Sequence, residues 1–413
     1  MEKTEVGVIG AGPAGLMAAI FSAQAGARTT LIEANTNAGR KLLMTGGGRC
    51  NITHQAAPAE LVRAFGAKGK FLSYCLYRFS PQDVQDFFVD LGLAMRIEED
   101  GCVFPVTDRA GDVRDVLVAR AKRLDVSFLY GRRISNITKE AGSFVLHSAG
   151  EQFGADRLIA ATGGLSWPKT GCTGDGYRFA RQFGHAVAEA KASLAPLVTH
   201  EKWPGQLAGT AVAEVMVSTR INNKKLTAAG ALIFTDDGIG GPAAQDMSRH
   251  LTDYLPAAGT PIGITLDLAP HVQEARLEAQ MTERTAVNPK KKVANVLGEF
   301  VPKRLAVVLC GQAGCDDESP AGQLRKDVRK KLVRMLKAVP LSIVRTRPIA
   351  EATVTRGGVS VTEVDAKTME SKVCPGLFFA GEVLDVDGPC GGYNLQACWS
   401  TAALAGSSAA IRR

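Results

Sequence analysis

Three glycines near the N-terminus have the spacing of a nucleotide-binding turn. Gly10, Gly12 and Gly15 follow an apolar run that is predicted to be a strand, and an alanine-rich helix is predicted directly after them. Glycines in these places allow a tight turn and let a pyrophosphate approach the first amides of the helix. Glu33 ends the next predicted strand, where a carboxylate can bind a ribose diol. The pattern predicts a dinucleotide site, although such glycines also occur in ordinary strand-to-helix turns.

Two further glycine clusters suit the same kind of ligand. The first, at residues 39–51, combines basic side chains, three consecutive glycines and a thiol within about a dozen residues, although such a segment could also be a flexible surface loop. The second, Gly391 and Gly392, opens a predicted helix after a buried strand that ends at Gly381 and Glu382. Contact from both ends of the chain suits extended FAD. No second G-x-G-x-x-G follows a predicted strand, so a separate NAD(P)H domain is not expected.

Hydrophobic periodicity places these clusters on an α/β fold. Residues 5–33 alternate as strand, helix and strand, which is the first unit of a doubly wound parallel sheet. Residues 126–161 contain short strands typical of a β-meander, and a helix is predicted over residues 80–91. From about residue 195, short strands broken by Pro and Gly predict a small barrel or sandwich, and residues 271–340 are helical and basic.

Composition excludes several classes of protein. The 413 residues are 46% hydrophobic and 22% charged, which is ordinary for a globular chain with two or three domains and excludes disordered, collagenous and small disulfide-linked proteins. The nine cysteines include no C-x-x-C pair, and no export signal is visible, so we expect a reduced cytoplasmic protein without a zinc site. No apolar stretch is long enough to predict a membrane span. The oligomeric state stays open.

Positive charge is concentrated in one segment. The chain has a formal net charge of +8, and residues 271–340 contain 14 Lys and Arg against 8 Asp and Glu, a net charge of +6. A basic helix on an insert can hold a phosphate backbone, although most such runs are solvated helix faces. The cations proposed for RNA contact form one consecutive cluster and one series at helical spacing: Lys290, Lys291, Lys292, Lys326, Lys330 and Arg334.

Four motifs together resemble the BaiN/RdsA-type family of bacterial NAD(P)/FAD-dependent oxidoreductases: GAGPAG, GRKLLMTGGGRCN, ATGGLSWPKTGCTGDGY and FAGEVLDVDGPCGGYNLQ. The resemblance implies an α/β, Rossmann-like FAD-binding domain at residues 1–194 and 341–413, interrupted by a β-barrel at 195–270 and a small helical insert at 271–340. It also implies a set of FAD contacts, in which the backbone of Ile134 lies near the adenine: Ala14, Glu33, Arg40, Lys41, Gly48, Asn51, Ile134, Thr162, Gly163, Gly381, Glu382, Gly392, Asn394 and Leu395.

The resemblance also implies a chemistry. Proteins similar to this family reduce conjugated C=C bonds, in steroid-like enones or in a uridine of ribosomal RNA, with NAD(P)H as a transient electron donor. Such a reduction needs a hydride from the flavin and a proton for the other carbon. Cys50 is the candidate proton donor because it lies in the glycine loop expected beside the flavin, although it could simply pack there; Tyr393 and Asp175 are weaker candidates. A flavin-dependent amine oxidase using O2 and an RNA-binding flavoprotein with structural FAD remain alternatives.

One departure from the family pattern concerns the substrate. Where the family commonly has Phe-Thr-His, this chain has Phe234-Thr235-Asp236. If the histidine contributes to substrate binding or proton transfer, a carboxylate at this position changes the charge of the site. The effect of Asp236 on substrate choice is therefore open.

Overall fold

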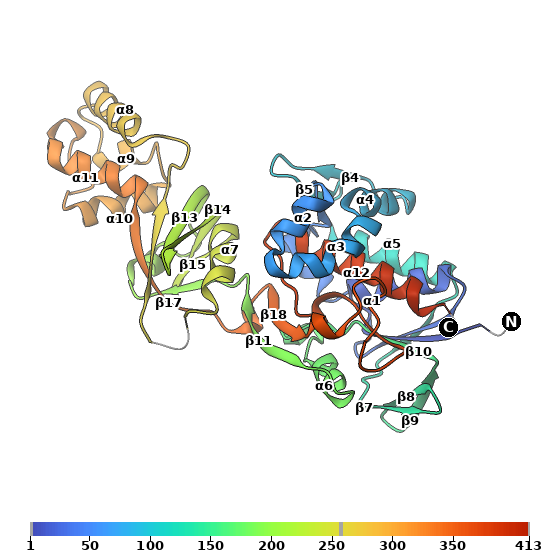
Figure 1. Ribbon diagram of the computed structural model, residues 1–413. Coiled ribbons are helices and arrows are strands. Elements are labelled where there is room, and N and C mark those ends of the chain that lie inside the picture. Colours follow the sequence, from blue (N-terminus) through green and yellow to red (C-terminus); the bar gives the residue numbers. More distant parts are fainter. Residues whose placement is uncertain (1–2, 256–258, 412–413) are drawn as a thin grey trace. The chain divides into compact units, whose positions relative to one another are not determined.

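The chain forms two units in the computed structural model, which describes residues 3–255 and 259–411 (Figure 1). Unit 1 comprises Met1–Lys191 and Thr353–Arg413, and unit 2 comprises Ala192–Ala352. The second border differs from the predicted one at residue 340, because the strand that follows the helical insert is still part of the barrel. Each unit has a hydrophobic core of its own.

A five-stranded parallel sheet forms the centre of unit 1. Its strand order is β19-β10-β1-β2-β6, and every neighbouring pair is parallel. Val8 in the central strand faces Leu31 on one side and Ile159 on the other, and all three are fully buried, as expected for a sheet covered on both faces. The strands are β1 (Glu5–Ile9), β2 (Arg28–Glu33), β6 (Ser127–Tyr130), β10 (Arg157–Ala160) and β19 (Leu377–Phe379).

Helices from opposite ends of the chain pack together against this sheet. A β-carbon at Gly406 would lie 2.3 Å from the Ala18 carbonyl oxygen, so glycine is needed where α12 crosses α1. Trp399 is completely buried and donates a hydrogen bond to the Ile52 carbonyl at 2.8 Å. The helices of this layer are α1 (Pro13–Gln24), α5 (Ala110–Arg123) and α12 (Tyr393–Ala409). The predicted nucleotide-binding unit is therefore completed by C-terminal residues (Figure 1).

Smaller elements of unit 1 surround this core. The predicted β-meander is present as the antiparallel sheet β7 (Asn136–Glu140), β8 (Ser143–Ser148) and β9 (Glu151–Ala155), whereas the predicted strands on either side of it belong to the parallel sheet. A second small sheet has the order β3-β5-β4, and β11 pairs with β18. The other elements are β3 (Thr53–His54), α2 (Pro58–Ala64), α3 (Gly69–Arg78), α4 (Pro81–Asp90), β4 (Met95–Ile97), β5 (Cys102–Pro105), α6 (Asp175–Gln182), β11 (Val187–Ser193) and β18 (Val354–Val359).

Unit 2 is built on a closed barrel of order β12-β15-β14-β13-β16-β17. The long hairpin β13–β14 turns at Asn222 and Asn223, which both have positive φ (49° and 62°), as a tight hairpin turn requires. Val215 and Val217 alternate into the barrel core. The strands are β12 (Leu197–Thr199), β13 (Ala211–Ile221), β14 (Lys224–Thr235), β15 (Gly238–Gly240), β16 (Ile262–Asp267) and β17 (Val339–Thr346), and α7 (Pro242–Leu251) follows β15.

Four helices are inserted between the last two barrel strands. Leu277 and Met281 on the first of them, and Leu332 and Leu336 on the last, are buried in the core of unit 2. The helices are α8 (Glu274–Val287), α9 (Val293–Leu297), α10 (Lys303–Ala313) and α11 (Lys326–Lys337). The predicted barrel and basic helical insert are both present. Within the described ranges, no helix combines the length and apolar character that crossing a membrane requires.

Candidate functional site

The N-terminal glycine turn is tightly packed at Gly10 and Gly15 and open at Gly12. Gly10 has φ +98°, and a β-carbon there would lie 2.6 Å from the Ala161 carbonyl oxygen. A β-carbon at Gly15 would lie 1.7 Å from the Gly10 oxygen, so neither position can carry a side chain. A β-carbon at Gly12 would meet no atom within 4 Å. Helix α1 begins at Pro13 without a side-chain cap, so its first amides face an open space that an anion can enter.

Glu33 lies against this turn at the end of β2. One of its carboxylate oxygens accepts a hydrogen bond from the Ala11 amide at 2.7 Å. The other accepts from the backbone amide of Asn35 at 2.8 Å and from its side chain at 2.6 Å. A carboxylate has about four acceptor positions, so a ribose hydroxyl can still be bound. Asn35 was not predicted from the sequence. Its side chain also accepts a hydrogen bond from Arg40 at 2.7 Å, so Arg40, a predicted FAD contact, is linked through Asn35 to Glu33.

The end of the β19 segment at Gly381 contacts the first turn of α1. Gly381 has φ +75°, and a β-carbon there would lie 2.6 Å from the Ala14 side chain. Glu382, which follows, forms a 2.5 Å ion pair with Lys41, and both side chains are more than four-fifths buried. Burial acts to lower the pKa of Lys41, but the Glu382 carboxylate outweighs it, so the pKa is raised and the ammonium is retained. Four of the predicted FAD contacts are thus brought together from distant segments.

Two residues that were not predicted complete the surroundings of this ion pair. Ser166 lies within hydrogen-bonding distance of both Lys41 Nζ (2.6 Å) and Glu382 Oε1 (2.9 Å). The Thr355 amide donates to the same Glu382 oxygen at 2.8 Å, while the Thr355 hydroxyl accepts from the Ser166 amide at 3.0 Å. The Tyr177 hydroxyl next to them is buried and has no hydrogen-bond partner among the described residues, and its burial raises its pKa. An orphaned hydroxyl beside a buried ion pair fits a site for a polar ligand.

The middle glycine loop adopts backbone conformations that few other residues tolerate. Gly46, Gly47 and Gly48 have φ of +57°, +67° and +92°, and a β-carbon at Gly47 would meet no atom within 4 Å. Asn51 at its end accepts a hydrogen bond from the Val103 amide at 3.3 Å and lies 2.8 Å from the place of a β-carbon on Gly392. The middle loop and the N-terminus of α12 are therefore in contact.

The remaining predicted contacts lie around these loops in unit 1. Thr162 and Gly163 follow β10, and Gly163 has φ +71° with Cys172 packed against it. The Asn394 side chain accepts a hydrogen bond from the Gly388 amide at 2.8 Å and donates one to the Gly388 carbonyl at 3.0 Å, which fixes the preceding loop. Leu395 is half-buried in α12. Ile134 is buried, and its segment is tied to β2 through the Arg132 amide and the Glu33 carbonyl.

Two candidate proton donors have contrasting surroundings. Cys50 is completely buried and has φ +62°. Burial raises the pKa of its thiol to about 12, which disfavours the thiolate that would remain after proton transfer. Tyr393, a weaker candidate from the sequence, stacks on His54 with ring centroids 4.7 Å apart, and the His54 Nδ1 lies 3.0 Å from the Gly391 carbonyl oxygen. No local sequence signal predicts this pair, because pairing of β3 with β5 positions His54.

A family model described as HI0933-like protein Rossmann domain matches residues 4–408. The chain belongs to this family. The sequence is 32% identical to a 3-dehydro-bile acid delta(4,6)-reductase of Clostridium scindens, over 98% of this chain and 99% of the relative. It is 33% identical to a ribosomal RNA dihydrouridine synthase of Escherichia coli, over 97% of both chains. The resemblance read from the motifs is therefore confirmed.

Solved structures of flavoenzymes share the fold. A flavocytochrome c3 fumarate reductase matches with a TM-score of 0.53 and 16% identity, covering 99% of this chain and 78% of the other. A 3-ketosteroid-delta4-(5alpha)-dehydrogenase of Rhodococcus jostii RHA1 matches with a TM-score of 0.52 and 16% identity, covering 99% and 97%. The predicted architecture, a Rossmann-type FAD-binding domain interrupted by a barrel and a helical insert, is confirmed.

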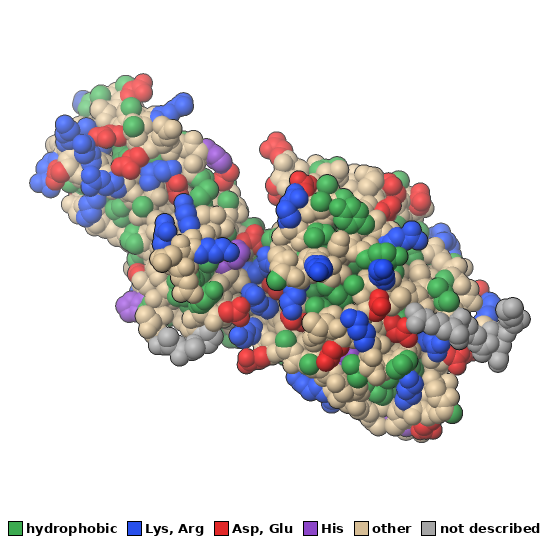
Figure 2. Space-filling model, in the orientation of Figure 1, with side chains coloured by type: hydrophobic (Ala, Val, Ile, Leu, Met, Phe, Trp, Pro, Cys, Tyr) green, Lys and Arg blue, Asp and Glu red, His purple; other side chains and the backbone are tan. Residues whose placement is uncertain are grey.

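Several cations of the basic insert of unit 2 have carboxylate partners nearby. In Figure 2, red side chains lie among more numerous blue ones over the region where α8–α11 lie in Figure 1. Among the six cations proposed for RNA contact, four have carboxylate partners within 4.0 Å: Lys291 with Glu299, Lys292 with Glu318, Lys330 with Glu278 and Arg334 with Glu274. No ion pair involving Lys290 or Lys326 occurs within the described ranges, and both are exposed. RNA contact by these six residues stays a prediction.

Asp236, which departs from the family pattern, is exposed at the β14–β15 turn of unit 2. The neighbouring Asp237 accepts hydrogen bonds from Arg347 at 2.7 and 3.1 Å, whereas no described residue forms an ion pair with Asp236. An unpaired exposed carboxylate is available to a ligand but does not identify one.

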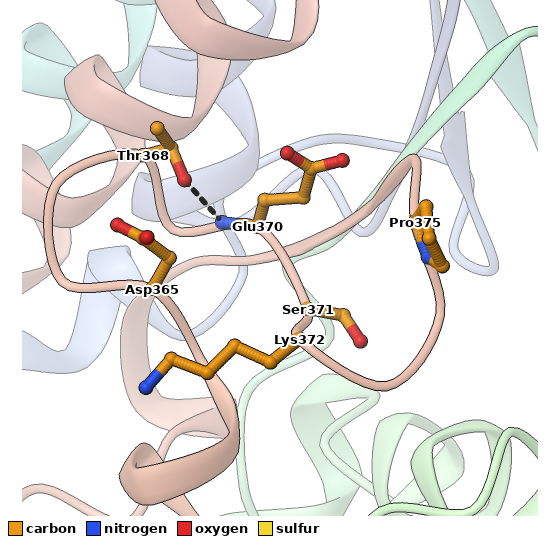
Figure 3. Close-up of a pocket in the computed structure, with 6 residues that line it drawn as sticks. All are labelled: Asp365, Thr368, Glu370, Ser371, Lys372 and Pro375. Carbon is orange, nitrogen blue, oxygen red and sulfur yellow. Dashed lines mark hydrogen bonds between the residues drawn. The ribbon is translucent and has the colours of Figure 1, made fainter.

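A pocket of about 210 Å³ in unit 1 lies apart from the predicted cofactor residues. The polar side chains in Figure 3 surround it, and the Thr368 hydroxyl accepts a hydrogen bond from the Glu370 amide at 3.2 Å. It is lined by Asp365, Thr368, Glu370, Ser371, Lys372 and Pro375. Because none of the glycine clusters contributes to it, this pocket is separate from the candidate site.

Proposed function

We propose that this protein is an FAD-dependent reductase of a conjugated C=C bond, with NADH or NADPH as the electron donor. The observation that carries the proposal is the intact dinucleotide cradle, in which Gly12 faces open space, α1 begins without a side-chain cap and Glu33 lies at the end of β2. This cradle occurs in a chain similar over its whole length to enzymes named as a delta(4,6)-reductase and a dihydrouridine synthase.

The cofactor residues have separate proposed tasks. FAD, when bound, supplies the hydride of the reaction. The amides at the start of α1 bind the pyrophosphate, Glu33 binds a ribose hydroxyl, and the backbone of Ile134 contacts the adenine. Lys41 and Glu382 supply a fixed ion pair at which ligand hydroxyls can be oriented, and the Tyr177 hydroxyl is free to join them. The other glycine-loop residues allow the ligand to approach the backbone closely.

For the proton, we assign delivery to the Tyr393 and His54 pair in preference to Cys50. The pair lies at the N-terminus of α12, next to Gly391 and Gly392, whereas burial makes Cys50 a weak acid. Tyr393→Phe is expected to lower kcat by about 10²-fold or more, which is the usual contribution of a general acid. Cys50→Ser is the matched control and should stay within about threefold of the wild-type kcat. The opposite ranking, measured under single-turnover conditions, would reassign the proton to the thiol.

For the substrate, we propose a uridine in RNA, whose pyrimidine ring contains a conjugated C=C bond. The net charge of +8 and the relatives named ribosomal RNA dihydrouridine synthase support this choice. A small steroid-like enone is the second candidate, because the relative named 3-dehydro-bile acid delta(4,6)-reductase is similar to this chain over an equal length.

The nine cysteines of the chain are free thiols, which supports the proposed cytoplasmic location.

The proposed function is tested with the purified holoprotein. FAD released by denaturation should be stoichiometric, and NADH or NADPH should bleach its absorbance without oxygen. Reoxidation is then followed with unmodified ribosomal RNA, with a steroid enone, and with air. Nucleoside mass spectrometry should show a gain of two hydrogens on uridine when RNA is the acceptor. Fast reoxidation by air with an amine donor would indicate an oxidase, and no acceptor-dependent turnover would indicate a structural flavin.

A further inference from the structure

The exposed face of α3 in unit 1 combines aromatic and basic side chains. Lys70, Tyr74, Tyr77 and Arg78 follow one another at helical spacing and lie on the same side of the helix. Tyr74 is 42% exposed and Tyr77 is 59% exposed. The opposite side of α3 is buried against α12 and the rest of the unit 1 core, so packing does not account for the two exposed rings. We call these four residues the α3 face.

We propose that the α3 face docks a single-stranded segment of RNA. The chemistry that supports this partner is the pairing of flat rings with cations, because bases stack on tyrosine while phosphates are attracted to lysine and arginine. The inference rests on the proposed function only in naming RNA as the substrate that the enzyme must hold. Figure 2 shows hydrophobic and basic side chains side by side over the part of unit 1 where α2 and α3 lie in Figure 1.

The charge of the α3 face is complementary to a polyanion. Residues 61–80 contain four cations, Arg63, Lys68, Lys70 and Arg78, and no Asp or Glu. Arg63 and Lys68 form ion pairs with Glu60 and Asp385. In the described part of the chain, neither Lys70 nor Arg78 has an ion pair or a side-chain hydrogen bond, so both charges are available to phosphates. Two cations of α11 in unit 2, Lys330 and Arg334, by contrast lie 3.9 and 4.0 Å from carboxylates of α8.

The α3 face is connected to the loop that leads into the candidate site. Lys68, just before α3, is paired with Asp385. The ring of Phe65, at the end of α2, packs on Gly388, where a β-carbon would lie 2.7 Å from it. Asn394 in the first turn of α12 fastens the same loop by its hydrogen bonds to Gly388. The N-terminal end of α3 is therefore joined by these contacts to the loop that precedes α12.

The proposal is tested by fluorescence anisotropy with a labelled 12-nucleotide single-stranded RNA and the FAD-loaded protein. The double variant Tyr74→Ala/Tyr77→Ala should bind at least about 10-fold more weakly, with an unchanged slope of log K against log salt. The variant Lys70→Ser/Arg78→Ser should reduce the magnitude of that slope by about 1.4, as expected for two lost phosphate contacts on a single strand. Lys122→Ser/Arg123→Ser is the matched control, because both residues are exposed on α5, and it should bind like the wild type.

Three results would overturn the α3 proposal: equal binding by the tyrosine variant, an equal loss in the α5 control, or tyrosine-dependent binding to vesicles of phosphatidylserine and phosphatidylcholine with none to RNA. Flavin reduction by NADH or NADPH, measured on the same samples, separates this test from the proposed function. Tyrosine-dependent RNA binding without acceptor turnover would support the α3 face and reject the reductase. Turnover of an enone without RNA binding would do the reverse.

Discussion

The two units differ in the polar residues that they bury. Among the described residues, the buried polar side chains of unit 2 are all Ser or Thr, which have only one hydroxyl each to hydrogen-bond. Unit 1 buries Glu33, His185, Asp387 and Gln396 as well, and its Lys41–Glu382 pair is mostly buried. Burying charge is costly unless partners are supplied. The difference indicates that the ligand chemistry is concentrated in unit 1, which also contains every predicted FAD contact.

The surfaces of the units differ in a related way. In unit 2, carboxylates of α8 and of neighbouring turns lie beside four of the six cations proposed for RNA contact, although the insert keeps a net charge of +6. In unit 1, the α3 face has exposed cations and rings without such partners. A high net charge in a segment therefore does not by itself identify the surface that is available to an anionic partner.

The largest effect is expected from Gly15→Ala in unit 1. Its methyl group would lie 1.7 Å from the Gly10 carbonyl oxygen, a backbone atom that cannot move without breaking the turn. We expect a loss of roughly 3 kcal/mol or more in the free energy of unfolding, or no soluble protein. Urea unfolding or yield in the soluble fraction measures this. Near-wild-type stability would contradict the packing described for the turn. Gly47→Ala, with space for a methyl group but φ +67°, should cost only about 1 kcal/mol.

The next largest effect is expected from breaking the buried ion pair. Lys41→Met leaves the Glu382 carboxylate buried without its cation and should cost about 3 kcal/mol in the free energy of unfolding. The double variant Lys41→Met/Glu382→Leu should recover most of that loss because no charge is then left unpaired. The free energies of unfolding of the single and double variants are compared by urea unfolding without FAD. If the single and double variants are equally destabilised, the pair contributes through packing and not through charge.

A smaller effect concerns the pH dependence of stability. Burial lowers the pKa of His185, and Glu363, 3.3 Å away, only partly opposes this. The unfolded chain therefore binds a proton more readily than the folded one, so the stabilisation is complete above the unfolded pKa of about 6.5 and is lost as the pH falls below it. His185→Gln should flatten the dependence of the unfolding midpoint between pH 7 and 5. An unchanged slope would show that other groups control it.

The smallest effects are expected in unit 2. Lys330→Ala and Arg334→Ala remove cations from long, exposed ion pairs with Glu278 and Glu274. Each should change the free energy of unfolding by less than about 0.5 kcal/mol. Thermal melts in 50 mM and 500 mM salt measure this, and the small differences should shrink at high salt. A loss above 1 kcal/mol would show that the insert depends on these pairs and would weaken the contrast with unit 1.

Local sequence patterns predict the parts of the site that are set by one turn or one element. The spacing of Gly10, Gly12 and Gly15 and the carboxylate at Glu33 could be identified because strand, turn and helix lie next to one another in the sequence. The barrel and the insert were visible as changes in hydrophobic period. The last barrel strand was misassigned because a single residue separates it from the insert and it pairs with strands more than 70 residues away.

Contacts between distant segments could not be predicted in this way. Ser166 and Thr355 reach the Lys41–Glu382 pair only after β10, β18 and β19 are arranged by tertiary packing. The stacking of His54 on Tyr393 likewise joins residues 339 positions apart. Cys50 was selected because it lies in the glycine loop expected beside the flavin, but the loop places the thiol in the core. Burial is a property of the assembled unit and leaves little trace in a single loop sequence.

The affinity of Gly12→Ala for FAD tests the central claim most directly. At φ −75° and ψ −173° alanine adds a methyl group without strain, and no protein atom lies within 4 Å of it. The thermal midpoint without FAD should therefore match the wild type within about 2 °C, while the Kd for FAD, titrated by flavin fluorescence, should rise at least about 10-fold. An unchanged Kd, with the fold intact, would contradict a flavin bound at this turn.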